Sequence, residues 1–446
     1  MRRCILVALL LPSEAWAGGY FYSDSGIVAL GRGGAWIAGA DTQFAQYHNP
    51  AGLIRVDAPT LNLGYSAVQQ NVTFDRLSDG AYQPTAENLA PPFSVPEIGF
   101  ATPISRKVGF AFGFTSPFAP SSLYDADGAQ RYTVIDTTIY QFQIGPAVAW
   151  QPVPWLTVGL GLQWQYLEIG ESLKLTTALV PGPENPAADV GVTVRGRDAF
   201  TPNANLGVLV EPVPELSIGL SVQLPSRFRA GGSAELDFSG SSLAALLEET
   251  TYADDDVFLD IDLPLVLRGG VAVRPVPTVE IEAAVVWQRW SSLEDITIRD
   301  VDVALQAQID LPDVPTEFVL PAGLSSTASY RLGGEWRALD ELALRAGGFW
   351  ESGSLPPQDI SVALYDPSKW QIGGGGSVFL VDQRLRFDAS AAFVQFQRLD
   401  VRDSTVTQVN ALDGPETVVG NGDYRSSGWV LGAAASWAFT PLRGAE

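Results

Sequence analysis

The chain has 446 residues, of which 27 are Lys or Arg and 50 are Asp or Glu, so its formal net charge is −23. This acidic balance argues against nucleic acid as a partner, because phosphate binding needs a basic surface. Only 17% of the residues are charged, whereas 44 are Gly and 12 are Trp. Few charges with many glycines and aromatic residues are unusual for a soluble protein and typical of a β-barrel in lipid.

Residues 1–17 have the three parts of a secretory signal peptide. These are a basic start, an apolar run and a small-x-small cleavage pattern, at Met1-Arg-Arg3, Ile5–Leu11 and Ala15-Trp16-Ala17. The apolar run is far too short for a transmembrane helix, which needs about 20 residues. We therefore expect an exported chain that starts at Gly18. Cleavage also removes Cys4, the only cysteine, which excludes disulfide and thiol chemistry.

Residues 18–57 show no alternation and are rich in Gly, Ala and Ser. Such a segment cannot build its own core, but it can fold inside a barrel lumen, where small residues allow close packing. We predict that it is an N-terminal hatch. Proline fixes its own φ and restricts the preceding residue, so Asn49-Pro50 predicts a rigid corner. The residues expected to form the hatch and gate are Gly31, Gly33, Gly34, Asn49, Pro50, Ala51 and Gly52.

The rest of the chain, 58–446, alternates between apolar and small or polar residues. Every second residue is apolar from Leu156 to Tyr166, and again from Leu216 to Leu224. A period of two predicts strands with one apolar face. That face would point into the core of a soluble sandwich, but out to lipid in a membrane barrel. Long strands and Trp residues near strand ends favour the barrel.

Turn signals give the number of strands. Short Pro-rich or polar turns, such as Pro152-Val-Pro-Trp155 and Pro212-Val-Pro-Glu215, alternate with long polar connections, such as residues 76–94 and 401–423. Short and long connections alternate in this way between the periplasmic and extracellular ends of outer-membrane barrels. We count fourteen strands by this criterion. The predicted fold is an all-β transmembrane antiparallel barrel with both chain ends on the periplasmic side.

The order of export signal, Gly-rich plug with an Asn-Pro-Ala corner, and long antiparallel barrel resembles the FadL-type outer-membrane transporters of hydrophobic compounds. Downstream segments that resemble the family include Pro225-Ser-Arg-Phe-Arg-Ala-Gly231 and Val286-Trp-Gln-Arg-Trp-Ser-Ser-Leu293. The resemblance implies a monomeric channel for passive uptake of long-chain fatty acids or aromatic hydrocarbons. It also implies contact with outer-membrane lipid and lipopolysaccharide, and with the barrel-insertion machinery during assembly.

In that family, substrate leaves sideways through a gap in the wall, which a kinked third strand creates. The corresponding strand here starts at Val108, and Gly109 and Gly113 are the candidate kink positions. Lateral exit into the membrane is therefore an expectation from the resemblance.

Charged residues on the lumen side of the barrel have two readings. Arg268, Arg331 or Arg345 could bind a substrate carboxylate, since Arg suits bidentate recognition of that group. Alternatively they pair with Glu280, Glu282 and Glu335 and anchor the hatch through Arg32 and Asp41. The mixed signs favour the second reading.

Enzymatic and metal-binding readings find little support. His48 is the only histidine, and no nucleophile lies beside it, so a hydrogen bond to the barrel wall is the expected role. Asp254-Asp255-Asp256 lacks EF-hand spacing and predicts a solvated extracellular loop rather than a metal site. In the same region Leu243, Leu246 and Leu247 predict a short amphipathic helix, which either catches apolar ligands or packs on loops. We expect no enzyme activity, no metal and no cofactor.

Two other functions stay open. A general aqueous porin would have an open charged lumen, and a non-transporting adhesin or structural barrel would carry its function in its loops.

Overall fold

The computed structural model describes residues 25–118, 121–180, 182–293, 295–308, 314–321, 323–412 and 414–439. The predicted signal peptide, the start of the predicted hatch at 18–24, and residues 440–446 lie outside them. In the part of the chain that is described, no helix has both the length and the apolar character needed to cross a membrane.

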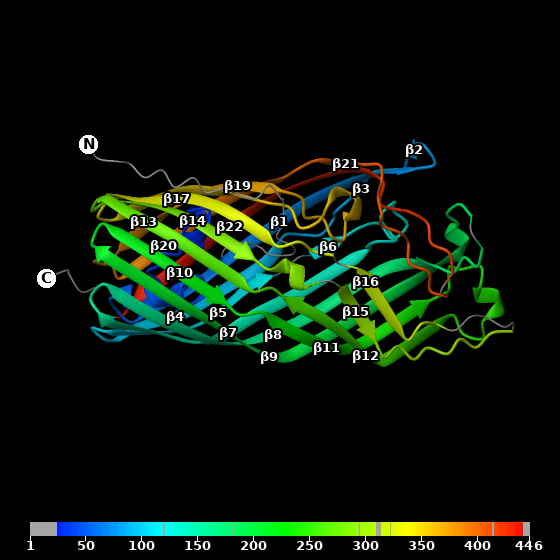
Figure 1. The fold of residues 1–446 in the computed structure, drawn as a ribbon, viewed down its shortest axis with the longest axis horizontal. Coiled ribbons are helices and arrows are strands. Elements are labelled where there is room, and N and C mark those ends of the chain that lie inside the picture. Colours follow the sequence, from blue (N-terminus) through cyan, green and yellow to red (C-terminus); the bar gives the residue numbers. More distant parts are fainter. Residues whose placement is uncertain are drawn as a thin grey trace, which may run out of the picture.

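One antiparallel sheet closes on itself as a barrel of 14 strands, which confirms the predicted fold class (Figure 1). The first and last strands close it, with Thr60 paired to Ala438 and Arg76 paired to Gly422. A closed barrel removes the sheet edge that would otherwise expose unpaired backbone groups. The barrel begins and ends at the same rim, as the even number of strands predicts.

Eight barrel strands are single elements, namely β1 (Thr60–Ser78), β4 (Phe93–Ser105), β7 (Asp136–Val153), β8 (Leu156–Thr176), β9 (Asp189–Val213), β18 (Leu342–Glu351), β19 (Lys369–Leu380) and β22 (Gly422–Ala438). Six are split in two, namely β5 (Val108–Phe118) with β6 (Ser121–Leu123), β10 (Leu216–Gln223) with β11 (Ser226–Asp237), β12 (Thr251–Leu263) with β13 (Val266–Val276), β14 (Val279–Gln288) with β15 (Asp295–Arg299), β16 (Glu317–Pro321) with β17 (Thr327–Leu339), and β20 (Leu385–Phe396) with β21 (Leu399–Val401).

The remaining elements are short. The first long loop carries β2 (Ala81–Tyr82) and β3 (Ala86–Glu87), and other loops carry η2 (Pro186–Ala188), η3 (Ala244–Leu246), η4 (Trp290–Ser292) and η5 (Pro357–Asp359). The segment before the barrel contains α1 (Ile27–Gly31), α2 (Ala45–His48) and η1 (Pro50–Arg55). Figure 1 shows this segment in dark blue inside the barrel, at the rim with the short turns.

The apolar face of the strands points outward, which decides between the sandwich and the barrel. In β8, Leu160 is 44% and Trp164 41% exposed, whereas Thr157 on the other face is 1% exposed. Further outward-facing aromatic residues, Trp150, Trp336 and Trp350, lie on other strands. A soluble sheet would bury this face, so the exposed apolar band is a lipid-facing surface.

Two loop predictions need correction. The acidic run Asp254–Asp256 belongs to β12 and not to a loop. Charges fit this strand because Asp255 and Asp256 are exposed. The predicted amphipathic helix is reduced to the 3-10 turn η3, and Leu247 packs into a buried apolar cluster with Val190 and Phe238. This contact supports the packing role of the loop.

Candidate functional site: a hatch, a roofed cavity and an interrupted strand ladder

The hatch segment, which we define as residues 25–57, fills the lumen at the rim with the short turns. Its α1 contacts β18, β19, β20 and β22, while η1 contacts β5, β7, β8 and β9 across the barrel. Apolar residues of the segment, such as Trp36 and Leu53, are almost completely buried. The barrel wall therefore supplies the core that this segment cannot build alone.

The wall approaches the hatch segment through its own glycines. A Cβ atom at Gly207 would lie 2.1 Å from Oδ1 of Asn49, and one at Gly159 would lie 2.3 Å from the backbone nitrogen of Ala51. On the hatch side, Gly33 has a φ of +60°, and its Cβ would lie 2.2 Å from the nitrogen of Gly348. These positions require glycine because a Cβ atom would overlap atoms of the facing segment.

Asn49 holds the predicted corner in place. Its side-chain amide donates to the carbonyl oxygens of Ile37 and Val208, each at 3.1 Å, and its Oδ1 accepts from the nitrogen of Ala51 at 3.2 Å. Val208 belongs to β9, so one side chain joins the corner both to the hatch segment and to the wall. The predicted gate residues Asn49, Pro50 and Ala51 thus meet at the wall opposite Gly159 and Gly207. Gly31, in contrast, lies on the other side of the lumen, near Ser390.

Glu282 anchors the hatch segment, chiefly by accepting backbone hydrogen bonds that the sequence did not predict. Its fully buried carboxylate accepts hydrogen bonds from the backbone nitrogens of Ile37, Ala38 and Gly39, at 2.6, 2.9 and 2.8 Å. Arg32 adds an ion pair of 2.7 Å to Glu280. The predicted anchoring ion pair of Arg32 is present, whereas Asp41 is exposed. No sequence motif marks a glutamate that binds consecutive backbone N–H groups of a distant segment.

The three candidate carboxylate-binding arginines are buried. Arg345 contacts Glu335 at 2.6 Å and Asp388 at 3.3 Å. Arg331 donates to the Ser329 hydroxyl at 2.7 Å and lies over the ring of Phe349, whereas Arg268 donates to Gln223 at 3.1 Å and lies over the ring of Tyr47. All three guanidinium groups have protein partners in place of a ligand.

His48 acts inside the hatch segment. Its Nε2 lies 2.7 Å from the carbonyl oxygen of Ser25, and its ring packs edge-on against Trp36 and Tyr47. Burial lowers the pKa of His48 to about 3, so the ring is neutral and Nε2–H donates. The predicted side-chain bond to the barrel wall is wrong, because the acceptor belongs to the hatch segment itself. The backbone oxygen of His48 does reach the wall, where it accepts from the Ser221 hydroxyl at 2.6 Å.

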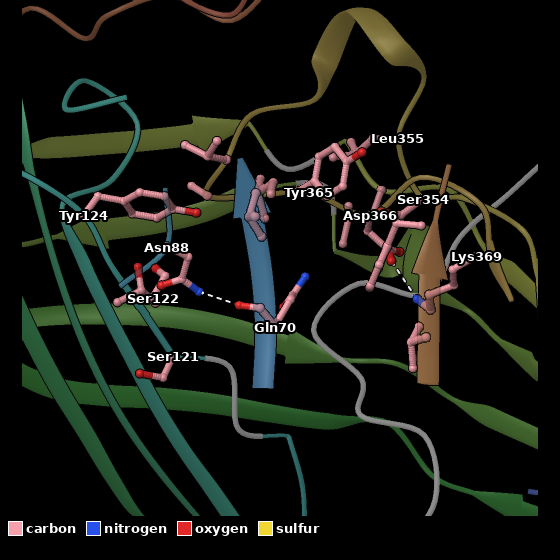
Figure 2. Close-up of a pocket in the computed structure, with 18 of the residues that line it drawn as sticks. Gln70, Asn88, Ser121, Ser122, Tyr124, Ser354, Leu355, Tyr365, Asp366 and Lys369 are labelled. Carbon is pink, nitrogen blue, oxygen red and sulfur yellow. Dashed lines mark hydrogen bonds and ion pairs between the residues drawn. The ribbon is translucent and has the colours of Figure 1, made fainter. Parts of the chain in front are cut away.

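A cavity of about 90 Å³ lies on the other side of the hatch segment, toward the long loops. Figure 2 shows side chains converging on it from β1, the loop before η5 and the start of β19. Apolar lining residues such as Val72, Leu355 and Phe396 form one buried cluster with Tyr47 of the hatch segment. The segment 352–368 supplies Ser354, Leu355 and residues 362–366 as a roof. The cavity is thus bounded by the hatch segment, the barrel wall and a loop.

The charged corner of the cavity is Lys369. Its Nζ lies 2.7 Å from Oδ1 of Asp366 and 2.9 Å from Oε1 of Glu351, and all three side chains are buried (Figure 2 draws the contact with Asp366). Burial raises the pKa of Asp366 to about 6. Sequence reasoning missed this cluster, since its members come from a strand end, a loop and the next strand start.

The strand ladder is interrupted beside the cavity. The pairing between β4 and β5 begins at Ser105 with Val108 and ends at Ile98 with Phe114. Above that point the described residues of the two strands form no further pairs, although β4 extends to Phe93. Beyond Phe114, the register between β5 and β7 also shifts. Thr115 pairs with Gln143 and Phe118 pairs with Gln141, so β5 has one residue more than β7 between these two pairs. The extra residue on β5 is a β-bulge.

The two predicted kink positions are not where the irregularity lies. Gly109 and Gly113 belong to the continuous part of the ladder. Both glycines instead face the hatch segment, since a Cβ at Gly109 would lie 2.3 Å from the oxygen of Leu53, and one at Gly113 would lie 2.3 Å from Nε2 of Gln46.

The ladder closes again above the interruption. The nitrogen of Leu89 donates to the oxygen of Leu123 at 2.7 Å, and the nitrogen of Leu123 donates to Asn88 Oδ1 at 3.0 Å. Asn88 and the neighbouring Ser121 and Ser122 line the cavity. The interruption and the cavity therefore share a wall.

Among the described residues, no group of three or more His, Cys, Asp or Glu side chains is arranged to hold a metal ion. Asp254 accepts instead from the backbone nitrogens of Asp256 and Asp302, at 3.0 and 2.7 Å.

Comparisons with known proteins agree with this geometry. Residues 8–439 match the family described as outer membrane protein transport protein (OMPP1/FadL/TodX). The long-chain fatty acid transport proteins of Escherichia coli K12 and Salmonella typhi are each 19% identical, over 455 and 444 residues, with 96% of each chain covered. A Pseudomonas aeruginosa FadL homologue of known structure has a TM-score of 0.77 at 15% identity, covering 95% of this chain and 100% of its own. The Pseudomonas putida toluene transporter TodX has a TM-score of 0.67 at 14% identity, covering 94% and 98%.

Proposed function

We propose that this chain, which belongs to the OMPP1/FadL/TodX family of outer-membrane transport proteins, takes up hydrophobic molecules passively through the roofed cavity and releases them sideways into the membrane. Membership of the family places the chain in the outer membrane and makes it a transporter of hydrophobic compounds rather than an enzyme. The route, the gating and the substrate are our proposal.

The observation that carries the proposal is the cavity beside the interrupted ladder. A ligand in this cavity has the hatch segment on one side and the wall around Asn88, Ser121 and Ser122 on another. The missing pairs between β4 and β5 leave that wall without its backbone bonds just below these residues. An apolar molecule that leaves at this point enters lipid and avoids the aqueous periplasm.

The hatch segment supports a hydrophobic route over an aqueous one. A general porin needs a water-filled lumen, whereas here Trp36, Leu53 and Glu282 pack hatch and wall together without a water-exposed surface. The hydrophobic candidates are long-chain fatty acids and aromatic hydrocarbons, the two classes named for the relatives above.

The experiment that tests the proposal measures uptake in cells that lack their own transporter of this kind. A labelled long-chain fatty acid and a labelled monoaromatic hydrocarbon are supplied to cells that express the intact chain or the variant Asn49→Ala/Pro50→Ala. The variant loses the bonds to Ile37 and Val208, so we expect a loosened cavity floor and a drop in uptake of the transported ligand. Asn71→Ala, at an exposed position of β1, is the matched control.

Insertion of equal amounts of folded barrel is checked first by the heat-dependent shift in gel mobility. Uptake of neither ligand by a correctly inserted intact chain would exclude both tested substrate classes and favour another apolar ligand or a barrel that does not transport.

A further inference from the structure

The charge balance of the cavity bears on which hydrophobic molecule it accepts. Of the described residues that line it, Asp366 and Lys369 are the charged ones. Lys369 already contacts two carboxylates, those of Asp366 at 2.7 Å and Glu351 at 2.9 Å. The one ammonium group at the cavity is therefore outnumbered, and the cluster carries an excess of negative charge.

A ligand carboxylate would meet this excess directly. A like charge disfavours the ionised form of a carboxyl group and its burial nearby. No arginine compensates, because Arg268, Arg331 and Arg345 are absent from the described lining and are held by other protein groups. The cavity thus lacks what a buried carboxylate needs.

The wall opposite Lys369 is polar but uncharged. It carries Gln70, Asn88, Ser121, Ser122 and Tyr124, and Figure 2 shows these side chains across the cavity from Asp366 and Lys369. The Tyr124 hydroxyl is buried and, among the described residues, has no hydrogen-bond partner. A buried hydroxyl without a partner is unfavourable, so a ligand that supplies one hydrogen-bonding group would be stabilised at this point.

We propose that the cavity selects uncharged apolar molecules that carry a hydroxyl group, such as alkylphenols or alcohols, and discriminates against carboxylates of the same skeleton. The ligand hydroxyl bonds to Tyr124, and its apolar part packs on Val72, Leu355 and Phe396. This inference rests on the proposed function and names the substrate class of the same site.

The test compares three ligands with one carbon skeleton, propylbenzene, 4-propylphenol and 4-propylbenzoate, by calorimetric titration of the purified intact protein in detergent. We expect the phenol to bind at least about tenfold more tightly than the benzoate, because only the benzoate brings a like charge. Tyr124→Phe should weaken phenol binding by about fivefold, the range of one neutral hydrogen bond, and leave propylbenzene unchanged.

A second variant reverses the charge balance. Glu351→Gln/Asp366→Asn removes both carboxylates from Lys369, so we expect benzoate binding to rise at least about tenfold while propylbenzene binding stays the same. Asp400→Asn, an exposed carboxylate on β21, is the control. If the double variant does not fold, the phenol and benzoate affinities of the intact protein and the Tyr124→Phe comparison still test the inference on ligand class.

The inference on ligand class and the proposed transport function can be overturned independently. Equal binding of phenol and benzoate by the intact protein, or an unchanged phenol affinity in Tyr124→Phe, overturns the inference on ligand class and leaves transport standing. If the purified protein binds 4-propylphenol as expected but cells that express it take up no 4-propylphenol, the proposed function is overturned and the inference on ligand class stands.

Discussion

Single glycines on the barrel wall decide how closely the hatch segment can lie against it. Gly207 of β9 is in ordinary extended backbone, so its need for glycine is steric and not conformational. An added methyl group would overlap Oδ1 of Asn49 at 2.1 Å and Cδ of Pro50 at 2.7 Å. Gly191 on the same strand is different, because the nearest atom to its Cβ would lie 3.6 Å away.

This contrast predicts the behaviour of two matched variants. Gly207→Ala should push the corner off the wall and destabilise the protein by about 1–3 kcal/mol, the usual cost of overpacking. Gly191→Ala should leave stability unchanged. The measurement is the thermal unfolding midpoint in detergent, with limited proteolysis of the hatch segment as a second readout. Equal midpoints for the two variants would contradict the close packing of the corner.

Asp366 makes ligand discrimination dependent on pH. Burial raises the pKa of its carboxyl group from an ordinary 3.8 to about 6. The charged groups that face it are Lys369 and, through Lys369, Glu351. As pH falls from about 7.5 to about 5.5, Asp366 takes up a proton and the excess negative charge of the cluster disappears.

We therefore expect 4-propylbenzoate, which stays largely ionised over this range, to bind more tightly at about pH 5.5 than at about pH 7.5. Affinity for propylbenzene should not change with pH. Titration calorimetry at both pH values checks this, and Asp366→Asn should abolish the difference. A pH dependence that persists in Asp366→Asn would assign the effect to another group.

At the scale of whole strands, alternation predicted the barrel closely. The alternation from Leu156 to Tyr166 lies in β8 (Leu156–Thr176), and the alternation from Leu216 to Leu224 lies in β10 (Leu216–Gln223) except for its last residue. This succeeds because a lipid-facing strand imposes a strict period of two over its whole length. The splits in the barrel strands, such as the one between β10 and β11, were not predicted. Both parts pair with β9, but the buried face shifts by one residue between Gln223 and Ser226.

Fewer features of the site than of the barrel could be predicted from the sequence. The Asn-Pro-Ala corner could be located because proline and glycine act locally. The cavity could not be located, since Tyr124, Asp366 and Phe396 are brought together only when the barrel closes. The interrupted ladder was expected at Gly109 or Gly113, but these glycines serve contact with the hatch segment, and the bulge lies between Thr115 and Phe118. Glycine in a strand has both uses, and sequence alone does not separate them.

The bulge of β5 yields a prediction of its own. Between Thr115 and Phe118 this strand has one residue more than β7 has between Gln143 and Gln141. Deletion of Ser116 should restore the register, let β5 continue beside β4 and close the interruption. We expect uptake of the transported ligand to fall strongly while the barrel still folds. Ser116→Ala keeps the extra residue and should retain uptake, although it loses the 2.7 Å bond from Ser116 Oγ to the oxygen of Gln141. Unchanged uptake in the deletion variant would place the exit elsewhere.

In the whole molecule, the barrel and the hatch segment have separable roles. The ladder between β1 and β22 closes the barrel without any residue of the hatch segment. The hatch segment, in turn, depends on the wall for nearly all of its burial and for anchors such as Glu282 and Val208. Loss of the hatch should therefore open the lumen and leave the barrel intact.

We predict that removal of residues 18–57 turns a closed channel into a water-filled pore. In planar bilayers the intact protein should show little ion conductance, because the hatch segment fills the lumen, whereas the shortened chain should conduct strongly and admit small hydrophilic antibiotics into cells. Glu282→Gln keeps the chain length but weakens the acceptor of three backbone N–H groups, so it should give brief, partial openings between these two extremes. Conductance that is equally high in all three proteins would contradict this prediction. That result would mean that ions already pass the hatch segment, as in an aqueous porin, and the packing of Trp36, Leu53 and Asn49 against the wall would then have to loosen in the membrane.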